Sequence, residues 1–94
     1  MLQLRGSIAI PPHTPSEFDH GDVQLISGRI FVAHTAADTV EVLDGEALTH
    51  LATIPGCQEG SGVLCAQDAS LVFAAARGAG KVIVIQASTS TVVG

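Results

Sequence analysis

The sequence predicts an all-β fold made of antiparallel four-stranded blades of the β-propeller kind, with about two blades and one extra outer strand. Three observations support this prediction. Short apolar or alternating runs bounded by Gly, Pro or Asp recur along the chain, helix signals are nearly absent, and one stretch is repeated after a fixed interval. A period of roughly 40 to 45 residues built from short strands is typical of propeller blades.

The composition indicates one small domain with a buried aliphatic core. Of the 94 residues, 47% are hydrophobic and 14% are charged, which is far from the balance of a disordered chain. Aromatic residues make up only 3%, with no Trp or Tyr, so the core must be built from Val, Ile, Leu and Ala around three Phe residues.

Eight segments have the length, β-branched content and punctuation of strands. They are residues 7–10, 22–26, 29–33, 39–44, 50–54, 62–66, 71–76 and 81–85. Residues 44–53 offer one alternative, because Asp44 could cap a short helix with Ala47, Leu48 and Leu51 on one face.

The repeat is visible without gaps. Residues 29–52 align with residues 71–94, and the identical pairs are Phe31/Phe73, Ala33/Ala75, Ala37/Ala79, Val40/Val82, Val42/Val84 and Thr49/Thr91. Further pairs are aliphatic on both sides, among them Ile30/Val72 and Leu43/Ile85. We interpret each copy as part of one blade.

The stretch "IFVAHTAADTVEVLDGEALTHLATIPG" resembles the repeat of the YVTN-type β-propellers. In that family an aliphatic "-YV-N" strand, a polar turn, a "TVSVID" strand and a "-VATIPVG" strand follow one another, and His34 stands where the family often places Asn. "VFAAARGAGKVIVIQ" is a degenerate second copy, with Gln86 in place of the usual Asp. The resemblance implies a seven-bladed propeller, and members of this family are often exported.

We therefore expect a single partial propeller domain over residues 1–94. Residues 1–11 would form the outer strand of a preceding blade, residues 22–55 the first blade and residues 62–94 the second. Two blades cannot close a ring, since four to eight are usual. Either missing blades of a longer protein or self-association of several copies would be needed to close it.

Charge and hydropathy limit the possible partners. The net charge is -5 and the four basic residues are scattered, so we expect no nucleic-acid partner. No apolar run reaches the length of a membrane span, and the N-terminus lacks the long apolar segment of a signal peptide, which leaves the localisation unknown. Cys57 and Cys65 lack C-x-x-C spacing and could be buried thiols, a disulfide, or reactive or ligating residues.

No catalytic motif is complete. "EGSGV" lacks the spacing of a nucleophile elbow, and "RGAGKV" lacks the first Gly and the Ser or Thr of a phosphate-binding loop. We interpret both as turns, and we predict no catalytic residues, no metal ligands and no cofactor.

Residues 11–22 form the one stretch rich in titratable side chains. In a propeller this link lies on the same face as the turns at residues 34–39 and 76–81 and the link at residues 56–61. We predict that this loop face binds a protein or a small-molecule ligand. The candidate binding residues are His13, Glu17, Asp19, His20, His34, Asp38, Glu59 and Arg77. The alternatives are a plain solvated loop and a metal held by His13 and His20. His50 falls in an outer strand and is predicted to be a surface residue.

Two functions from different classes fit these observations. The first is a β-propeller repeat module that acts as a binding scaffold through its loop face, without catalysis of its own. The second is a fragment of a propeller hydrolase such as a lactonase, with a divalent metal in some cases. Fold alone does not choose between them.

Overall fold

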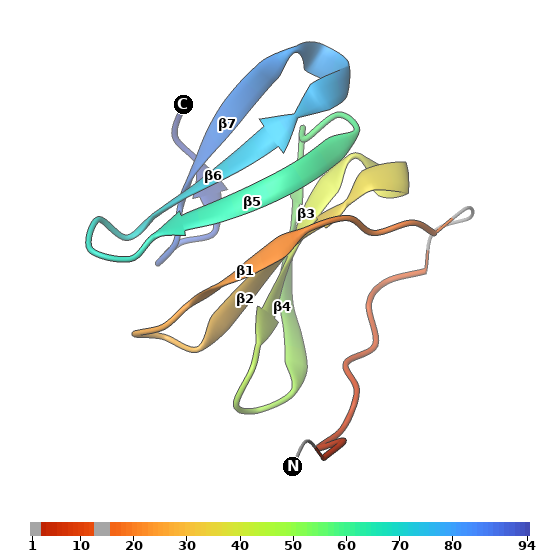
Figure 1. The fold of residues 1–94 in the computed structure, drawn as a ribbon, viewed down its shortest axis with the longest axis vertical. Coiled ribbons are helices and arrows are strands. Elements are labelled where there is room, and N and C mark those ends of the chain that lie inside the picture. The colour runs from red at the N-terminus through yellow and green to blue at the C-terminus, as the bar shows by residue number, and fades with distance from the viewer. Residues whose placement is uncertain (1–2, 13–15) are drawn as a thin grey trace.

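The computed structural model describes residues 3–12 and 16–94 and contains two antiparallel four-stranded sheets (Figure 1). The first sheet has the order β1-β2-β3-β4 and the second β5-β6-β7-β8, so each sheet is a meander of consecutive strands. β1 and β5 lie side by side where the two sheets meet. The predicted all-β class with two blade-like sheets is confirmed.

Seven of the eight predicted segments form strands, and the eighth strand, β8, lies at the end of the second predicted blade. Those of the first sheet are β1 (Gly21–Gln24), β2 (Arg29–His34), β3 (Thr39–Asp44) and β4 (Thr49–Pro55). Those of the second are β5 (Gly60–Ala66), β6 (Leu71–Ala76), β7 (Lys81–Gln86) and β8 (Thr91–Val92).

The sequence repeat is also a repeat of backbone geometry. A single 3₁₀ turn links β2 to β3 and another links β6 to β7, at η1 (Thr35–Ala37) and η2 (Arg77–Ala79). The equivalent residues Asp38 and Gly80 end these turns in the left-handed conformation, at φ 58° and 64°. Corresponding backbone hydrogen bonds also recur, such as Gly45 N–H to Gly28 O and Ala87 N–H to Ser70 O, each 2.9 Å.

The core lies between the two sheets. Because successive strand residues point to opposite faces, Phe31 and its cross-strand partner Val42 both face the second sheet. The buried residues of this inter-sheet core are Phe31, Val40, Val42, Ile54, Cys57, Cys65, Val72, Ala74, Ala76, Ile83, Ile85 and Ala87. Polar contacts join the sheets too: Asp22 Oδ2 accepts a hydrogen bond from Cys65 N–H at 2.8 Å, and the Arg29 guanidinium donates to Ala87 O at 2.7 Å.

Two predicted elements differ from the structure. The helix considered for residues 44–53 is absent, because Asp44 Oδ1 accepts hydrogen bonds from the N–H groups of Glu46 and Ala47 and closes a tight turn that leads into β4. Residues 1–11 were expected as an outer strand, and the part of them that the structure describes, residues 3–11, has no regular secondary structure. A strand needs a hydrogen-bonded partner strand, and among the described residues this segment pairs with none of the strands of the two sheets.

The two outer faces of the sheet pair are unequal. Over the first sheet, residues 8–12 cross the face that points away from the core. On the second sheet the corresponding face is open, with Leu64 64% and Val82 57% exposed beside the half-buried Phe73. The described part of the chain contains no helix with the length and hydrophobicity needed to cross a membrane.

Candidate functional site

The structure brings the predicted loop segments together. Backbone hydrogen bonds tie each link to a neighbouring turn: Ala36 N–H to Glu17 O, His20 N–H to Ser61 O, Cys57 N–H to Asp38 O and Gly78 N–H to Gln58 O. Residues 16–20, 34–38, 57–61 and 77–78 therefore lie on one edge of the sheet pair, as the blade assignment predicts. Whether this edge binds a ligand stays a prediction.

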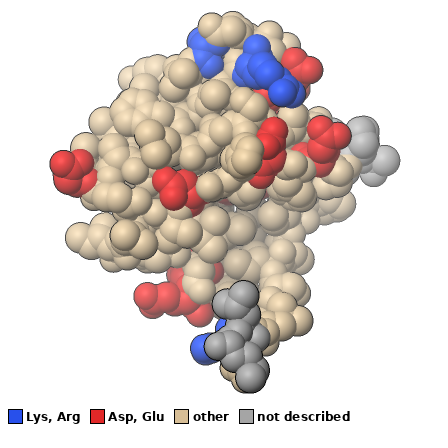
Figure 2. All heavy atoms as spheres, viewed as in Figure 1, with Lys and Arg blue, Asp and Glu red and all other residues tan. Residues whose placement is uncertain are grey.

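The candidate side chains on this edge differ in what they do. Asp38 Oδ1 accepts a hydrogen bond from Glu59 N–H at 2.9 Å, so its carboxylate fixes the neighbouring link. His20 is a surface residue, with its side chain 83% exposed and 3.4 Å from the Asp19 carboxylate. Glu17, Glu59 and Arg77 are exposed, and His13 lies outside the described residues. In the view of Figure 2, acidic and basic side chains cover only a small part of a mostly uncharged surface.

His34 is not part of that exposed group. It is the last residue of β2 and follows Ile30 and Val32 onto the outer face of the first sheet, where it is only 1% exposed. Phe18 stacks on its ring, with centroids 4.2 Å apart and planes inclined by 14°. Strand alternation therefore buries His34 on the outer face of the first sheet, apart from the exposed loop side chains, and its part in ligand binding stays a prediction.

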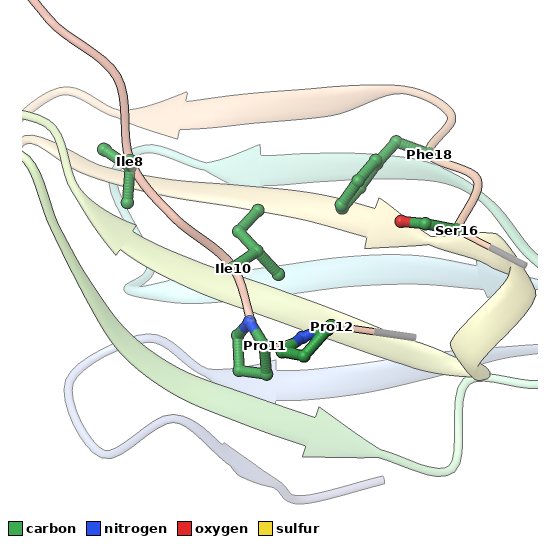
Figure 3. Close-up of a pocket in the computed structure, with 6 residues that line it drawn as sticks. All are labelled: Ile8, Ile10, Pro11, Pro12, Ser16 and Phe18. Atoms are coloured by element: carbon green, nitrogen blue, oxygen red, sulfur yellow. The ribbon is translucent and has the colours of Figure 1, made fainter. Parts of the chain in front are cut away.

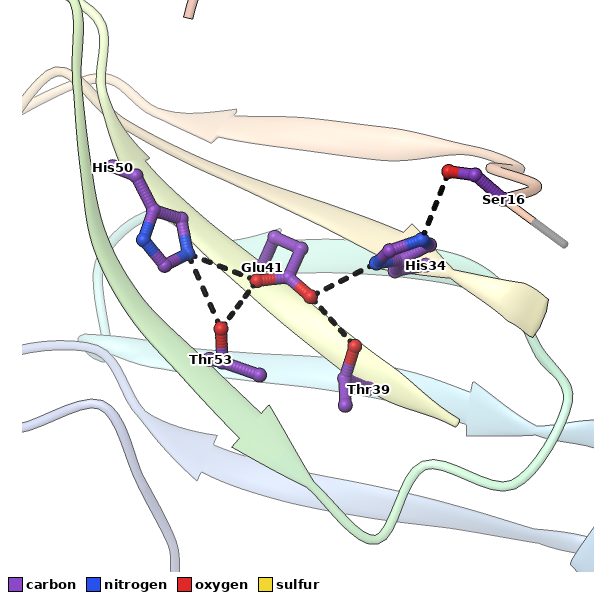
Figure 4. A network of polar contacts seen from close by, with 6 residues as sticks. All are labelled: Ser16, His34, Thr39, Glu41, His50 and Thr53. Atoms are coloured by element: carbon purple, nitrogen blue, oxygen red, sulfur yellow. Dashed lines mark hydrogen bonds and ion pairs between the residues drawn. The ribbon is translucent and has the colours of Figure 1, made fainter. Parts of the chain in front are cut away.

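His34 belongs to a buried polar network centred on Glu41 of β3 (Figure 4). One carboxylate oxygen, Oε2, lies 3.0 Å from His34 Nδ1 and accepts from Thr39 Oγ1 at 2.7 Å. The other, Oε1, lies 2.9 Å from His50 Nε2 and accepts from Thr53 Oγ1 at 2.6 Å. The side chain of His50 is only 21% exposed, so His50 is partly buried in this network and is not the simple surface residue that the sequence predicted.

The Glu41 carboxyl is ionised at neutral pH. Burial by itself raises its pKa, but hydrogen bonds from Thr53, Thr39, His50 and His34 together outweigh burial and lower the pKa below its usual value. A carboxylate has no hydrogen to donate, so the ring nitrogens of His34 and His50 that face it must carry the hydrogens. For a neutral His34 this leaves Nε2 as a hydrogen-bond acceptor.

A serine hydroxyl lies at that nitrogen. Ser16 Oγ is 3.3 Å from His34 Nε2, and the two side chains come from segments that are far apart in the sequence. Ser16, His34 and Glu41 thus form a hydrogen-bonded series of hydroxyl, imidazole and carboxylate (Figure 4). Such a series can polarise the hydroxyl toward loss of its proton.

Two hollows flank this series. The larger has a volume of about 300 Å³ and has Ser16 in its wall, with Ile8, Ile10, Pro11, Pro12 and Phe18 around it (Figure 3). The smaller, of about 170 Å³, is lined by Pro11, Pro12, His34, Ala37, Thr39, Glu41 and Thr53. Pro11 and Pro12 line both hollows, so the segment that contains them lies between the two.

Sequence reasoning missed Ser16, Thr39, Glu41, His50 and Thr53. A signal was available in "TVEVLD", where Thr39 and Glu41 share one face of a strand whose other residues are mainly apolar. His34 pairs with Thr39 across β2 and β3, and Glu41 with Thr53 across β3 and β4, so a register assignment would have gathered them. Ser16 carried no such signal, because a loop has no register.

The cysteines are two free, buried thiols. Burial raises the pKa of Cys65 to about 11, with a further contribution from the Asp22 carboxylate, and burial raises the pKa of Cys57 as well. Neither thiol is therefore activated as a nucleophile. Within residues 3–12 and 16–94, no group of three or more His, Cys, Asp or Glu side chains is arranged to hold a metal ion.

Comparison with known proteins gives no assignment. The chain matches no protein-family model, and no curated protein matches it significantly.

Proposed function

We propose that this chain is a β-propeller repeat module of the YVTN type that acts as a binding scaffold. In this proposal the outer face of the second sheet packs against a further blade-like sheet. The loop edge formed by residues 16–20, 34–38, 57–61 and 77–78 is then presented to a protein or small-molecule partner.

One observation carries the proposal. Phe73, Ala75, Val82 and Val84 form the outer face of the second sheet, and they are identical to Phe31, Ala33, Val40 and Val42 at the equivalent positions of the first. The copies in the first sheet are buried because the second sheet covers them. The same side chains on an uncovered face support the presence of an equivalent covering sheet.

The shape and chemistry of the open face agree with this. It contains a shallow apolar hollow of about 330 Å³ lined by Gly62, Val63, Leu64, Phe73, Ala75 and Val82. Exposed apolar patches of this kind mark interaction surfaces on soluble proteins. The face of the first sheet differs, because residues 8–12 already cover part of it.

A second copy of the chain is the partner for the test. We expect the purified chain to self-associate in sedimentation velocity at micromolar concentrations, and Val82→Glu to abolish association because it places a charge in the apolar hollow. Ile26→Glu is the matched control: Ile26 is 88% exposed in the β1–β2 turn, away from this face, and the variant should associate like the wild type. A Val82→Glu variant that associates as well as the wild type would refute this face as the packing surface, and a monomeric wild type would exclude a second copy of the chain as the covering sheet.

A further inference from the structure

We propose that Ser16, His34 and Glu41 form a hydrolytic site for uncharged esters of small apolar acids. In this site Ser16 is the nucleophile and His34 is the general base, while Glu41 is a positioning residue that acts through His34. The proposal is independent of blade packing: His34 and Glu41 lie on the outer face of the first sheet and Ser16 lies in the link beside it, whereas the face proposed to pack against a further blade-like sheet belongs to the second sheet.

The main support for the proposal is the sequence of contacts from the Ser16 hydroxyl through the His34 ring to the Glu41 carboxylate. The hydroxyl oxygen of Ser16 meets Nε2 of His34 at 3.3 Å, and Nδ1 of the same ring meets Glu41 Oε2 at 3.0 Å. Because the ionised Glu41 holds the hydrogen of His34 on Nδ1, Nε2 is the nitrogen that can take the serine proton. A nucleophile, a base and a group that orients the base then follow in the sequence that serine hydrolases require. The nucleophile–base distance is somewhat long, as is common before substrate binds.

Glu41 is a buried carboxylate whose two oxygens are both held by hydrogen bonds. Its two oxygens take four hydrogen-bond contacts, from His34, Thr39, His50 and Thr53, and it is 2% exposed. No buried side-chain nitrogen or oxygen of the described residues lacks a partner. A carboxylate held by hydrogen bonds at both oxygens favours one tautomer and one orientation of the imidazole, which is the role of the third member of such a series.

The position of Ser16 is fixed by the residues that follow it in the chain, residues 17–19, which contact β2 and η1. Two residues after Ser16, Phe18 stacks on the His34 ring at 4.2 Å. On either side of Phe18, Glu17 O accepts from Ala36 N–H at 3.3 Å and Asp19 N–H donates to Ala33 O at 3.0 Å. The segment is therefore anchored to β2 and η1, and Ser16 is held over the imidazole edge.

The larger hollow indicates the substrate class. Its wall is built from Ile, Pro and Phe side chains, with the hydroxyl of Ser16 as its polar side-chain group, and its volume is about 300 Å³. Apolar pockets with one placed polar group bind apolar groups in a fixed orientation. Among the described residues that line it none is charged, so a short uncharged acyl chain fits it better than an anionic substrate does.

The reaction balances with water as the only co-reactant. Ser16 Oγ attacks the ester carbonyl carbon while its proton passes to His34 Nε2. The C–O bond to the alcohol then breaks, and the alcohol oxygen takes that proton. Water attacks the acyl-serine and gives a proton to His34 Nε2, the bond between the acyl carbon and Oγ breaks, and Ser16 regains its proton. The net products are one acid and one alcohol.

The first experiment measures hydrolysis and covalent labelling of the purified chain. We expect it to hydrolyse 4-nitrophenyl butyrate above the buffer rate and to be labelled by a fluorophosphonate probe. Trypsin should release residues 6–29, which contain Ser7, Ser16 and Ser27, and fragmentation of this peptide by mass spectrometry should place the label on Ser16. A label on Ser7 or Ser27, or no hydrolysis by the folded chain, would overturn the proposal.

Matched variants then separate chemistry from folding. Ser16→Ala should abolish labelling and lower kcat at least about 100-fold, whereas Ser27→Ala, on the same tryptic peptide, should leave both unchanged. Glu41→Gln should lower kcat and leave KM nearly unchanged, because Glu41 does not line the larger hollow. Wild-type rates in folded Ser16→Ala would refute the site, and an unchanged kcat in folded Glu41→Gln would remove Glu41 from it. Val82→Glu, which tests packing of the second sheet, should hydrolyse the ester at the wild-type rate. The hydrolytic site and the packing of the second sheet are therefore tested separately.

Discussion

The two sheets are copies of one unit, and the same residues have different environments in them. Val40 is fully buried whereas its copy Val82 is 57% exposed, and Phe31 is fully buried whereas Phe73 is half-buried. The compared residues are identical and have the same cross-strand partners in both sheets, so the difference in exposure arises from what lies against each face. Burial in a repeat protein is thus a property of the neighbouring repeat.

The opposite faces differ in chemistry. Where the second sheet presents Ala76 and Ile83 to the core, the first sheet presents His34 and Glu41 to its own outer face. In a plain repeat these positions would be apolar in both copies. The first sheet therefore carries polar chemistry where repeat packing alone would favour apolar contact, which is why the candidate hydrolytic site lies there.

The largest expected effect comes from truncating the two equivalent phenylalanines. Phe31→Ala should lower the free energy of unfolding by about 3–5 kcal/mol, because it leaves a cavity in the inter-sheet core. Phe73→Ala should cost about 1–2 kcal/mol at low protein concentration, since solvent reaches the site. Urea unfolding followed by circular dichroism measures both values.

Protein concentration sharpens this comparison. If a second copy covers the outer face of the second sheet, the cost of Phe73→Ala should rise toward that of Phe31→Ala as concentration increases. Equal costs for the two variants in a monomeric sample would show that the two faces do not differ in burial, contrary to the structure.

The second-largest expected effect comes from replacing Glu41, the centre of the polar network, with the apolar residue at the equivalent position of the second sheet. Glu41→Ile copies Ile83 and should cost about 2–4 kcal/mol, because the donors on His34, His50, Thr39 and Thr53 lose their buried acceptor. Glu41→Gln should cost less, since its amide oxygen still accepts. Thermal and urea unfolding of both variants provide the measurement.

A double variant shows whether the network acts as a unit. Adding His34→Ala, which copies Ala76, to Glu41→Ile removes a side chain whose contact with Glu41 is already lost, so the double variant should be less destabilised than the sum of the two single changes. Strict additivity would mean that His34 and Glu41 do not depend on each other for stability.

The two four-stranded sheets could be predicted from the sequence because the patterns that specify them lie within short stretches of the chain. Alternation of apolar residues, turn residues and a 42-residue repeat determine strand type, strand order and the equivalence of Asp38 with Gly80. The order of the strands also brought the loop segments around Asp38 and Glu59 together correctly, since an edge of a meander collects its alternate turns.

The sequence was insufficient for the Glu41 network for two physical reasons. His34 was assigned to the loop because a turn follows it, although strand alternation directs its side chain onto a face. The contact between Ser16 and His34 depends on how a link without regular structure crosses a sheet, and no period in the sequence specifies that path. The segment 7–10 was misassigned as a strand for a related reason, since a strand-like pattern forms a strand only where a partner strand is available.

The third prediction concerns pH. The pKa of Glu41 is lowered in the folded chain from a usual value of 4.5, so near that pH the unfolded chain binds more protons than the folded chain. The stabilisation is therefore complete above about pH 4.5 and is lost as pH falls through the lower pKa of the folded chain. Glu41→Gln should flatten the decline of urea stability on acidification, and a decline as steep as that of the wild type would contradict this assignment. Asp44→Asn is the comparison, because backbone N–H groups of Ala47 and Glu46 also lower the pKa of Asp44.

The smallest expected effect exchanges the two residues that end the 3₁₀ turns. Asp38→Gly copies Gly80 and keeps the left-handed backbone, but it removes the acceptor of the Glu59 N–H bond, so it should cost about 1 kcal/mol. Gly80→Asp copies Asp38 at a position where a new Cβ meets nothing within 4 Å, and Asp tolerates a positive φ, so its cost should be smaller, below about 0.5–1 kcal/mol. Urea unfolding of the two variants gives the difference. A larger loss at Gly80 than at Asp38 would mean that backbone strain, and not the bond to the neighbouring link, determines which residue each turn requires.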